Sequence, residues 1–176
     1  MKQTFSLLIL LCVLAISATQ CKKGDTGPQG PPGTANVIYS EWFTPNPYIK
    51  DTIFGTWGFK YNKAAPLITQ QILDSGSVLT FGKLLGYNPA VWPTNVVQQL
   101  PIQITYKQSG NTNTDTWSAR VSPGNVQIRF VNDFNEYNVI ATQHQFRYII
   151  IPGGAKGVRM ARRSYEEICK EYGIPE

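Results

Sequence analysis

Three residues of one loop, Tyr87, Asn88 and Trp92, could together bind a ligand. An indole ring can stack on a sugar ring, and a nearby hydroxyl or amide can hydrogen-bond to the same ligand. Core packing is the alternative for Trp92. It is the better interpretation for Trp57 and Trp117, which lie in segments of alternating apolar and polar residues. The loop is therefore the candidate ligand site, with a glycan or a surface protein as the partner.

Two carboxylates, Glu41 and Glu136, could instead act as the acid and base of a glycan hydrolase. Such a pair works only when the carboxyl groups lie about 5 to 10 Å apart in a cleft. The sequence lacks the usual catalytic constellations, since it has one histidine, no G-x-S-x-G and no G-x-x-x-x-G-K-[ST] motif. We therefore expect no catalytic residues and no cofactor, and we keep the hydrolase as the alternative.

A cluster of oxygen-bearing side chains, Asp133, Asn135 and Glu136, could bind calcium. An EF-hand loop starting at Asp133 would need an oxygen ligand at position 137, glycine at 138 and glutamate at 144, and the sequence has none of them. A turn rich in Asn and Asp is the better interpretation, so no metal site is expected. The single histidine, His144, has no evident partner and is expected to be exposed or half-buried. Cys169 is expected to be a half-buried packing residue.

The charge distribution argues against a nucleic-acid partner. The chain has 16 basic and 11 acidic residues and a formal charge of +5, and no segment concentrates this charge. One basic cluster lies near the C-terminus and consists of Lys156, Arg159, Arg162 and Arg163. Glutamates follow it closely, so we interpret it as a solvated linker.

The first twenty residues have the order of a secretory signal peptide. Lys2 is followed by an almost entirely apolar run from Phe5 to Ile16 and then by small and polar residues. The apolar run is shorter than the roughly 20 residues that a transmembrane helix needs. We therefore predict that residues 1–20 are a signal peptide.

Cys21 directly follows this signal and looks like the lipid acceptor of a bacterial lipoprotein. The resemblance implies cleavage before Cys21 and acylation of its thiol, although Gln20 stands where such proteins usually have Gly or Ala. Two or three acyl chains would anchor the mature chain to a membrane. Simple cleavage and secretion is the alternative, and Cys21 could then pair with Cys169 in a disulfide.

A collagen-like tract follows, in which glycine recurs every third residue at Gly24, Gly27, Gly30 and Gly33. Here the chain resembles the collagen-like lipoproteins of gram-negative bacteria, in which a lipidated cysteine, a few lysines and a brief Gly-X-Y tract precede a compact β domain. Residues 21–34 are interpreted as the lipidated cysteine and a spacer. A stalk that forms a homotrimer is the minority interpretation, because lipid anchoring concentrates the chains in two dimensions.

Between Ala35 and Pro152, repeated prolines leave runs that suit strands better than helices. The segment is predicted to be mainly β, an antiparallel β-sandwich of about seven or eight strands. Turn-like stretches at 109–115 and 122–125 predict two consecutive hairpins, and a short helix is expected at 69–74. The predicted strands cover residues 36–43, 56–61, 77–84, 102–107, 116–121, 126–131 and 145–151.

Residues 153–176 are predicted to form a loop and a short C-terminal α-helix. Ser164 and Glu167 match the capping-box pattern, and Gly173 stands where a helix ends. The narrow apolar stripe should cover an edge or an open end of the sandwich core.

These expectations combine into one hypothesis about function. The mature chain would be a lipid-anchored, non-enzymatic cell-envelope or surface protein of the bacterial outer membrane, on its periplasmic or its cell-surface side. Its partners would be the membrane, through the lipid, and a glycan or a surface protein, and its role would be binding or structural.

Overall fold

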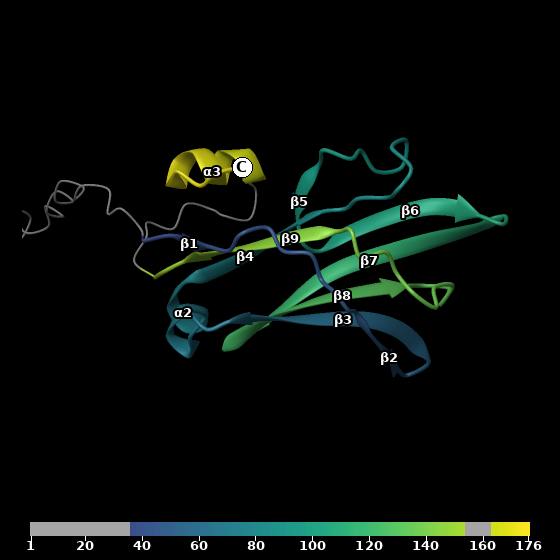
Figure 1. Ribbon diagram of the computed structural model, residues 1–176, viewed down its shortest axis with the longest axis horizontal. Coiled ribbons are helices and arrows are strands. Elements are labelled where there is room, and N and C mark those ends of the chain that lie inside the picture. The colour runs from purple at the N-terminus through teal and green to yellow at the C-terminus, as the bar shows by residue number, and fades with distance from the viewer. Residues whose placement is uncertain (1–35, 154–162) are drawn as a thin grey trace, which may run out of the picture. The chain divides into compact units, whose positions relative to one another are not determined.

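The computed structural model describes residues 36–153 and 163–176, which form a mainly β structure of two antiparallel sheets packed together. The strand orders are β1-β9-β4-β5 in the four-stranded sheet and β2-β3-β8-β7-β6 in the five-stranded sheet (Figure 1). The predicted sandwich with a short C-terminal helix is therefore confirmed. The predicted signal peptide, Cys21, the collagen-like tract and most of the basic cluster lie outside the described residues.

The described part of the chain contains nine strands and two helices. Their bounds are β1 Ile38–Tyr39, β2 Ile49–Ile53, β3 Thr56–Ala65, α2 Gln70–Ser75, β4 Ser77–Lys83, β5 Val97–Gln99, β6 Ile102–Gln108, β7 Asn111–Ser122, β8 Gly124–Asn132, β9 Gln145–Ile151 and α3 Tyr165–Tyr172. The prediction missed β2 and β5, which lie at sheet edges, where few buried positions produce a pattern. The first predicted strand is shorter than expected, because only β1 and an isolated bridge between Phe43 and Phe146 pair with β9.

Both predicted hairpins are present in the five-stranded sheet, but the first has a much shorter turn. Only Ser109 and Gly110 form the turn, both with positive φ, and β7 already begins at Asn111. Asn113 and Asp115 therefore belong to β7, where they pair with residues of β6 and point into the buried side of the sheet. The composition of the stretch 109–115 is typical of a turn. Its residues 111–115 nevertheless form part of a strand, because the buried polar side chains of Asn113 and Asp115 find hydrogen-bond partners there.

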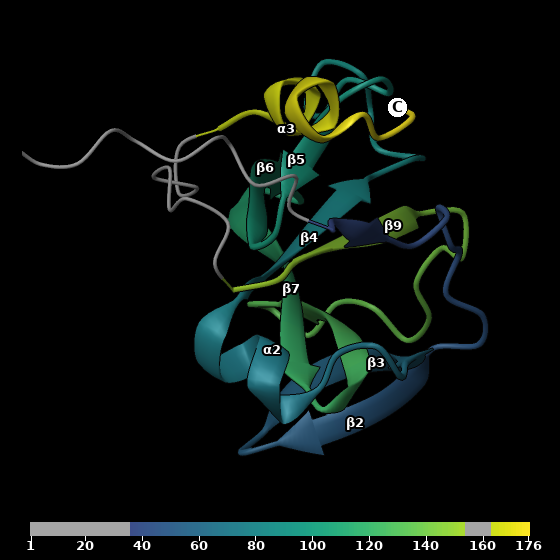
Figure 2. The same cartoon turned by 90° about the vertical axis from the view of Figure 1, so that its left-hand side faces the viewer.

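The main core lies between the two sheets (Figure 2). The alternate residues Trp117, Ile128 and Phe130 of β7 and β8 face it, together with Phe146 and Ile150 of β9. The rings of Trp117 and Phe130 lie 4.7 Å apart between centroids, in a tilted arrangement that favours aromatic contact. Core packing is thus confirmed for Trp117. It is wrong for Trp57, which is half-buried outside both core clusters and has the Lys50 ammonium over its ring.

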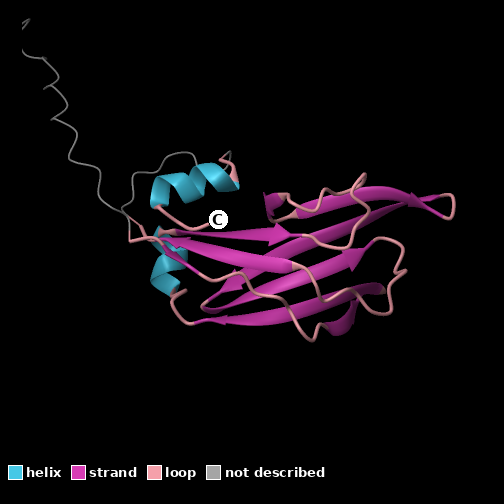
Figure 3. Ribbon diagram, turned by 45° about the horizontal axis from the view of Figure 1, so that its top comes forward, coloured by secondary structure: helices cyan, strands magenta, loops and turns pink. Residues whose placement is uncertain are grey.

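Helix α3 covers the outer face of the four-stranded sheet (Figure 3). The predicted capping box is present, with the Ser164 hydroxyl accepting from the Glu167 backbone N–H and the Glu167 carboxylate accepting from the Ser164 N–H. Tyr165, Ile168 and Cys169 are buried against the sheet, so the helix covers a face and not the expected edge or open end. Because both faces of this sheet are covered, consecutive residues of β4 and β9 are buried, without alternation between buried and exposed positions.

Helix α2 agrees with the predicted short helix, and its N-terminus is capped by Thr69, whose hydroxyl accepts from the Ile72 backbone N–H at 3.3 Å. Neither described helix has the length and apolar character required to cross a membrane.

Candidate functional site

A cavity of about 200 Å³ opens at one end of the sandwich. It lies where β4 ends, β9 begins and β7 starts, so it is bounded by Asp115 and Trp117 of β7 and by the loops on either side. Tyr87 lines it from the loop after β4, whereas Tyr137 and His144 line it from the loop before β9. The five-stranded sheet thus forms the floor of the cavity, and the loops form its walls.

The Asp115 carboxylate, which is 1% exposed, is the centre of a hydrogen-bond network beneath the cavity. Its Oδ1 accepts from the Asn132 amide at 2.8 Å, and its Oδ2 accepts from the Tyr87 hydroxyl at 2.9 Å. The Tyr87 oxygen in turn accepts from the Trp117 indole N–H at 3.0 Å. These contacts fix the positions of Tyr87 and Trp117 on the cavity wall, because a buried polar group without a partner is costly.

Two further tyrosines complete the network. The hydroxyls of Tyr106 and Tyr137 lie 2.6 Å apart, and they lie 3.4 and 3.5 Å from the Asp115 carboxylate oxygens. Burial raises the pKa of both tyrosines, so their hydroxyls stay protonated at neutral pH.

Burial raises the pKa of Asp115, and hydrogen bonds from Asn132 and the tyrosines oppose this effect. Within the ranges 36–153 and 163–176, the ion pairs join other residues, and no cationic side chain pairs with Asp115. The site therefore contains a buried acid whose described partners are all neutral.

His144 is buried, with 4% exposure, which corrects the expectation of an exposed or half-buried imidazole. Its Nδ1 accepts a hydrogen bond from the Leu85 backbone N–H at 3.1 Å, and its ring lies edge-on to Trp117 with centroids 4.5 Å apart. Burial lowers the pKa of His144 to about 4. The imidazole is therefore neutral at pH 7, and its proton is on Nε2.

The structure separates the three residues predicted to bind a ligand. Tyr87 lines both the cavity and an adjacent groove of about 310 Å³, and Asn88 lines the groove. The Asn88 side chain also accepts from the Ala90 backbone N–H at 2.9 Å. Trp92 packs in the main core and is 9% exposed, so little of its ring is open to a ligand. The loop thus contributes Tyr87 and Asn88 to the surface of the cavity and groove, whereas Trp92 is buried in the core.

No protein-family model, curated protein or solved structure matches the chain. The site must therefore be interpreted from its own geometry.

The carboxylates considered for hydrolysis belong to different sheets. Glu41 is exposed next to β1 of the four-stranded sheet, whereas Glu136 follows β8 of the five-stranded sheet and accepts from the Asn113 amide at 2.7 Å. The expected Asn- and Asp-rich turn is present around Glu136. There, Asp133 accepts from the Thr114 N–H at 2.8 Å, and Asn135 accepts from the Trp57 N–H at 2.7 Å. No group of three or more potential metal-binding side chains occurs in the described ranges.

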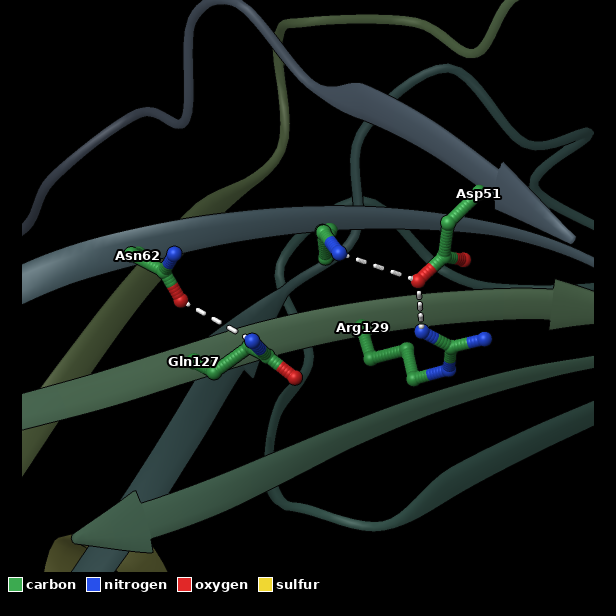
Figure 4. Close-up of polar contacts among 5 residues, drawn as sticks. Asp51, Asn62, Gln127 and Arg129 are labelled. Carbon is green, nitrogen blue, oxygen red and sulfur yellow. Dashed lines mark hydrogen bonds and ion pairs between the residues drawn. The ribbon is translucent and has the colours of Figure 1, made fainter. Parts of the chain in front are cut away.

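A second polar cluster lies on the opposite, outer face of the five-stranded sheet (Figure 4). The Asp51 carboxylate lies 2.8 Å from the Arg129 guanidinium and 3.2 Å from the Lys60 ammonium. The bond to Arg129 lowers the pKa of Asp51. Because Asp51 is in the edge strand β2 and Arg129 is in β8, the pair connects these strands across Gly58 of β3. This cluster is assigned a structural role.

Cys169 is a buried free thiol in the described part of the chain, and burial raises its pKa. A protonated thiol packed against a sheet is a poor nucleophile, which agrees with the packing role expected from the sequence.

Sequence reasoning missed most of the residues that build the site and its surroundings, namely Tyr106, Asp115, Asn132 and Tyr137 of the Asp115 network and the neighbouring Asn113. One signal could have found two of them. In the stretch 111–117, Asn113 and Asp115 alternate with threonines and continue in register to Trp117, as expected for a strand with a polar end on its buried face.

Proposed function

We propose that the mature chain is a lipid-anchored, non-enzymatic binding domain of the bacterial cell envelope. The anchor is Cys21, and the collagen-like tract acts as a spacer on the outer membrane. The observation that carries the binding role is the aromatic-walled cavity at the end of the sandwich, whose floor is fixed by the Asp115 network. Ligand sites commonly combine an apolar cavity with a few oriented polar groups in this way.

The states of the polar groups favour recognition over catalysis. Both oxygens of the Asp115 carboxylate already accept hydrogen bonds from residues that hold it in place. The Nδ1 atom of His144 is occupied by the Leu85 N–H, and the low pKa of this imidazole makes it a weak base. Fixed groups of this kind can orient a ligand without exchanging protons with it.

The spacer gives the cavity access to ligands away from the lipid surface. Ten residues in polyproline II conformation extend about 31 Å, at about 3.1 Å per residue. Attachment to the membrane would concentrate the domain where envelope glycans and surface proteins occur, so a modest affinity at the cavity would be sufficient.

Cell fractionation tests the proposed location. The native chain should co-purify with outer-membrane vesicles, and Cys21→Ala should abolish this association without removing the folded domain. Protease treatment of intact cells then distinguishes the cell-surface side from the periplasmic side. A native chain found only in the soluble fraction would contradict the anchor.

A glycan array tests the proposed binding role. The mature chain with Cys21→Ala is compared with the same protein carrying Val139→Trp, which adds a bulky ring at an exposed residue that lines the cavity. Ligands that bind at the cavity should be lost in the variant. Sizing by light scattering, with and without residues 22–34, tests whether the tract forms a trimer.

A further inference from the structure

The starting point is the buried carboxyl group of Asp115, which forms no ion pair within the described residues. The residue is 1% exposed, and among the residues that the structure describes, its hydrogen-bond donors are an asparagine and tyrosines, all neutral. A buried carboxylate is costly unless a charge of opposite sign compensates it. Asp115 is one of the residues that line the cavity, so a cation bound there would lie close to this carboxyl group.

The donors are also limited in number. Asn132 and Tyr87 donate at 2.8 and 2.9 Å, whereas Tyr106 and Tyr137 share one short hydrogen bond, which uses one of their two protons. The remaining proton can reach Asp115 only at 3.4 or 3.5 Å. The carboxyl group thus receives its two closest hydrogen bonds from neutral donors, and because burial raises its pKa, a cation bound beside it would favour its ionised form.

Aromatic rings form part of the cavity lining, beside aliphatic side chains, and such rings suit a cation. Trp117 and Phe130 are almost fully buried in the lining, whereas Tyr87 and Tyr137 are half-buried, so the tyrosines offer the rings that can attract positive charge. The chain already uses this interaction elsewhere, since the Lys50 ammonium lies 3.5 Å from the ring centroid of Trp57.

The size of the cavity restricts the ligand. Its volume of about 200 Å³ is below the roughly 300 Å³ at which pockets for drug-sized molecules begin. A head group of a few heavy atoms would fill it, with the rest of the molecule extending into the open groove beside Tyr87.

We infer that this cavity binds a small quaternary ammonium group, which lies against Tyr87 and Tyr137 and is compensated by the Asp115 carboxylate. A quaternary ammonium fits better than a primary amine. It carries charge without hydrogen-bond donors, and both oxygens of Asp115 already accept hydrogen bonds from the protein. The inference specifies the ligand class of the proposed binding domain and rests on that proposal.

Calorimetric titration of the mature chain with Cys21→Ala tests the inference. The probes are choline and its neutral isostere 3,3-dimethyl-1-butanol. Choline should bind about tenfold or more tightly, because cation–π attraction and charge pairing act on the cation alone. The Trp117 indole N–H resonance should shift on binding. Equal affinities for the two probes, or no binding of choline, would overturn the inference.

Variants test which residues are responsible. Asp115→Asn should lose the preference for choline over the neutral probe. The control Asp74→Asn makes the same change at an exposed position of α2, and this variant should bind choline as the native protein does. If Asp115→Asn fails to fold, the exposed position Val139 gives a second test. Val139→Glu should bind choline several-fold more tightly than Val139→Lys, because the two charges act oppositely on a cation at the cavity. Equal binding by these two variants would overturn the placement of the cation.

Two further arms separate the remaining possibilities. Ethanolamine binding more tightly than choline would overturn the quaternary assignment. Phosphatidylcholine vesicles compared with free choline show whether the head group comes from a lipid or from a soluble molecule, and binding to either source supports the inference. A glycan that binds in a Val139-dependent way while choline does not bind would refute the cation and leave the proposed binding function intact.

Discussion

Replacing His144 with asparagine should remove a pH-dependent loss of stability. The imidazole is buried against Trp117, and burial lowers its pKa to about 4 from an ordinary value of 6.5. The Oδ1 atom of asparagine can accept from the Leu85 N–H in place of Nδ1, so the substitution removes the titrating group and keeps its hydrogen bond. The variant loses packing, but that loss does not depend on pH.

The magnitude follows from the two pKa values of His144. The unfolded chain takes up a proton near pH 6.5 and the folded chain only near pH 4, so the folded state is progressively disfavoured as the pH falls between these values. At about 1.36 kcal/mol per pKa unit, the full effect is about 3 kcal/mol. Between about pH 7 and about pH 5, the native protein should lose about 2 kcal/mol of unfolding free energy that the variant keeps.

Urea unfolding followed by circular dichroism, at a series of pH values, measures this difference. Comparing the two proteins cancels the contributions of groups they share, including Asp115, whose raised pKa acts in the opposite direction. The stability advantage of the native protein over His144→Asn should shrink as the pH falls. Parallel stability curves for the two proteins would refute the burial argument.

Three other substitutions test the packing. Gly58→Ala should destabilise the domain by about 1 to 3 kcal/mol, because its Cβ would displace the Arg129 guanidinium from the Asp51 carboxylate; an unchanged urea midpoint would contradict this. Ser164→Ala should lower the free energy of unfolding by about 1 kcal/mol, because it removes the N-terminal cap of α3, and thermal unfolding measures this loss. An equal loss on replacing the exposed Lys107 by alanine would show that the cap is not the cause. Trp92→Ala should cost about 3 to 5 kcal/mol as a core truncation, and a fully stable variant with weakened ligand binding would restore the surface role expected from the sequence.

Local signals in the sequence were sufficient for the elements that local chemistry determines. The capping box at Ser164 and the glycine at 173 define both ends of α3 through contacts within one turn. The alternation around Trp117 likewise defines a strand with one buried face. In each case the deciding interactions join residues close in the sequence, so a single chain segment carries the information.

The candidate site could not be predicted in this way, because its contacts span long distances in the sequence. His144 has no local partner, and the Leu85 N–H that binds it is 59 residues away. Asp115 has the composition of a turn around it, and it becomes a buried strand residue only when Asn132 and Tyr87 supply hydrogen bonds. Tertiary partners decide such positions, and local propensity does not.

The mass of the native N-terminal peptide tests the central claim, the lipid anchor on the binding domain, most directly. Protein purified from membranes of its host would be digested, and its first peptide would be measured by mass spectrometry. The account predicts a peptide that begins at Cys21 and carries the added mass of a diacylglyceryl group. A peptide that retains residues 1–20, or one with an unmodified Cys21 thiol, would contradict it.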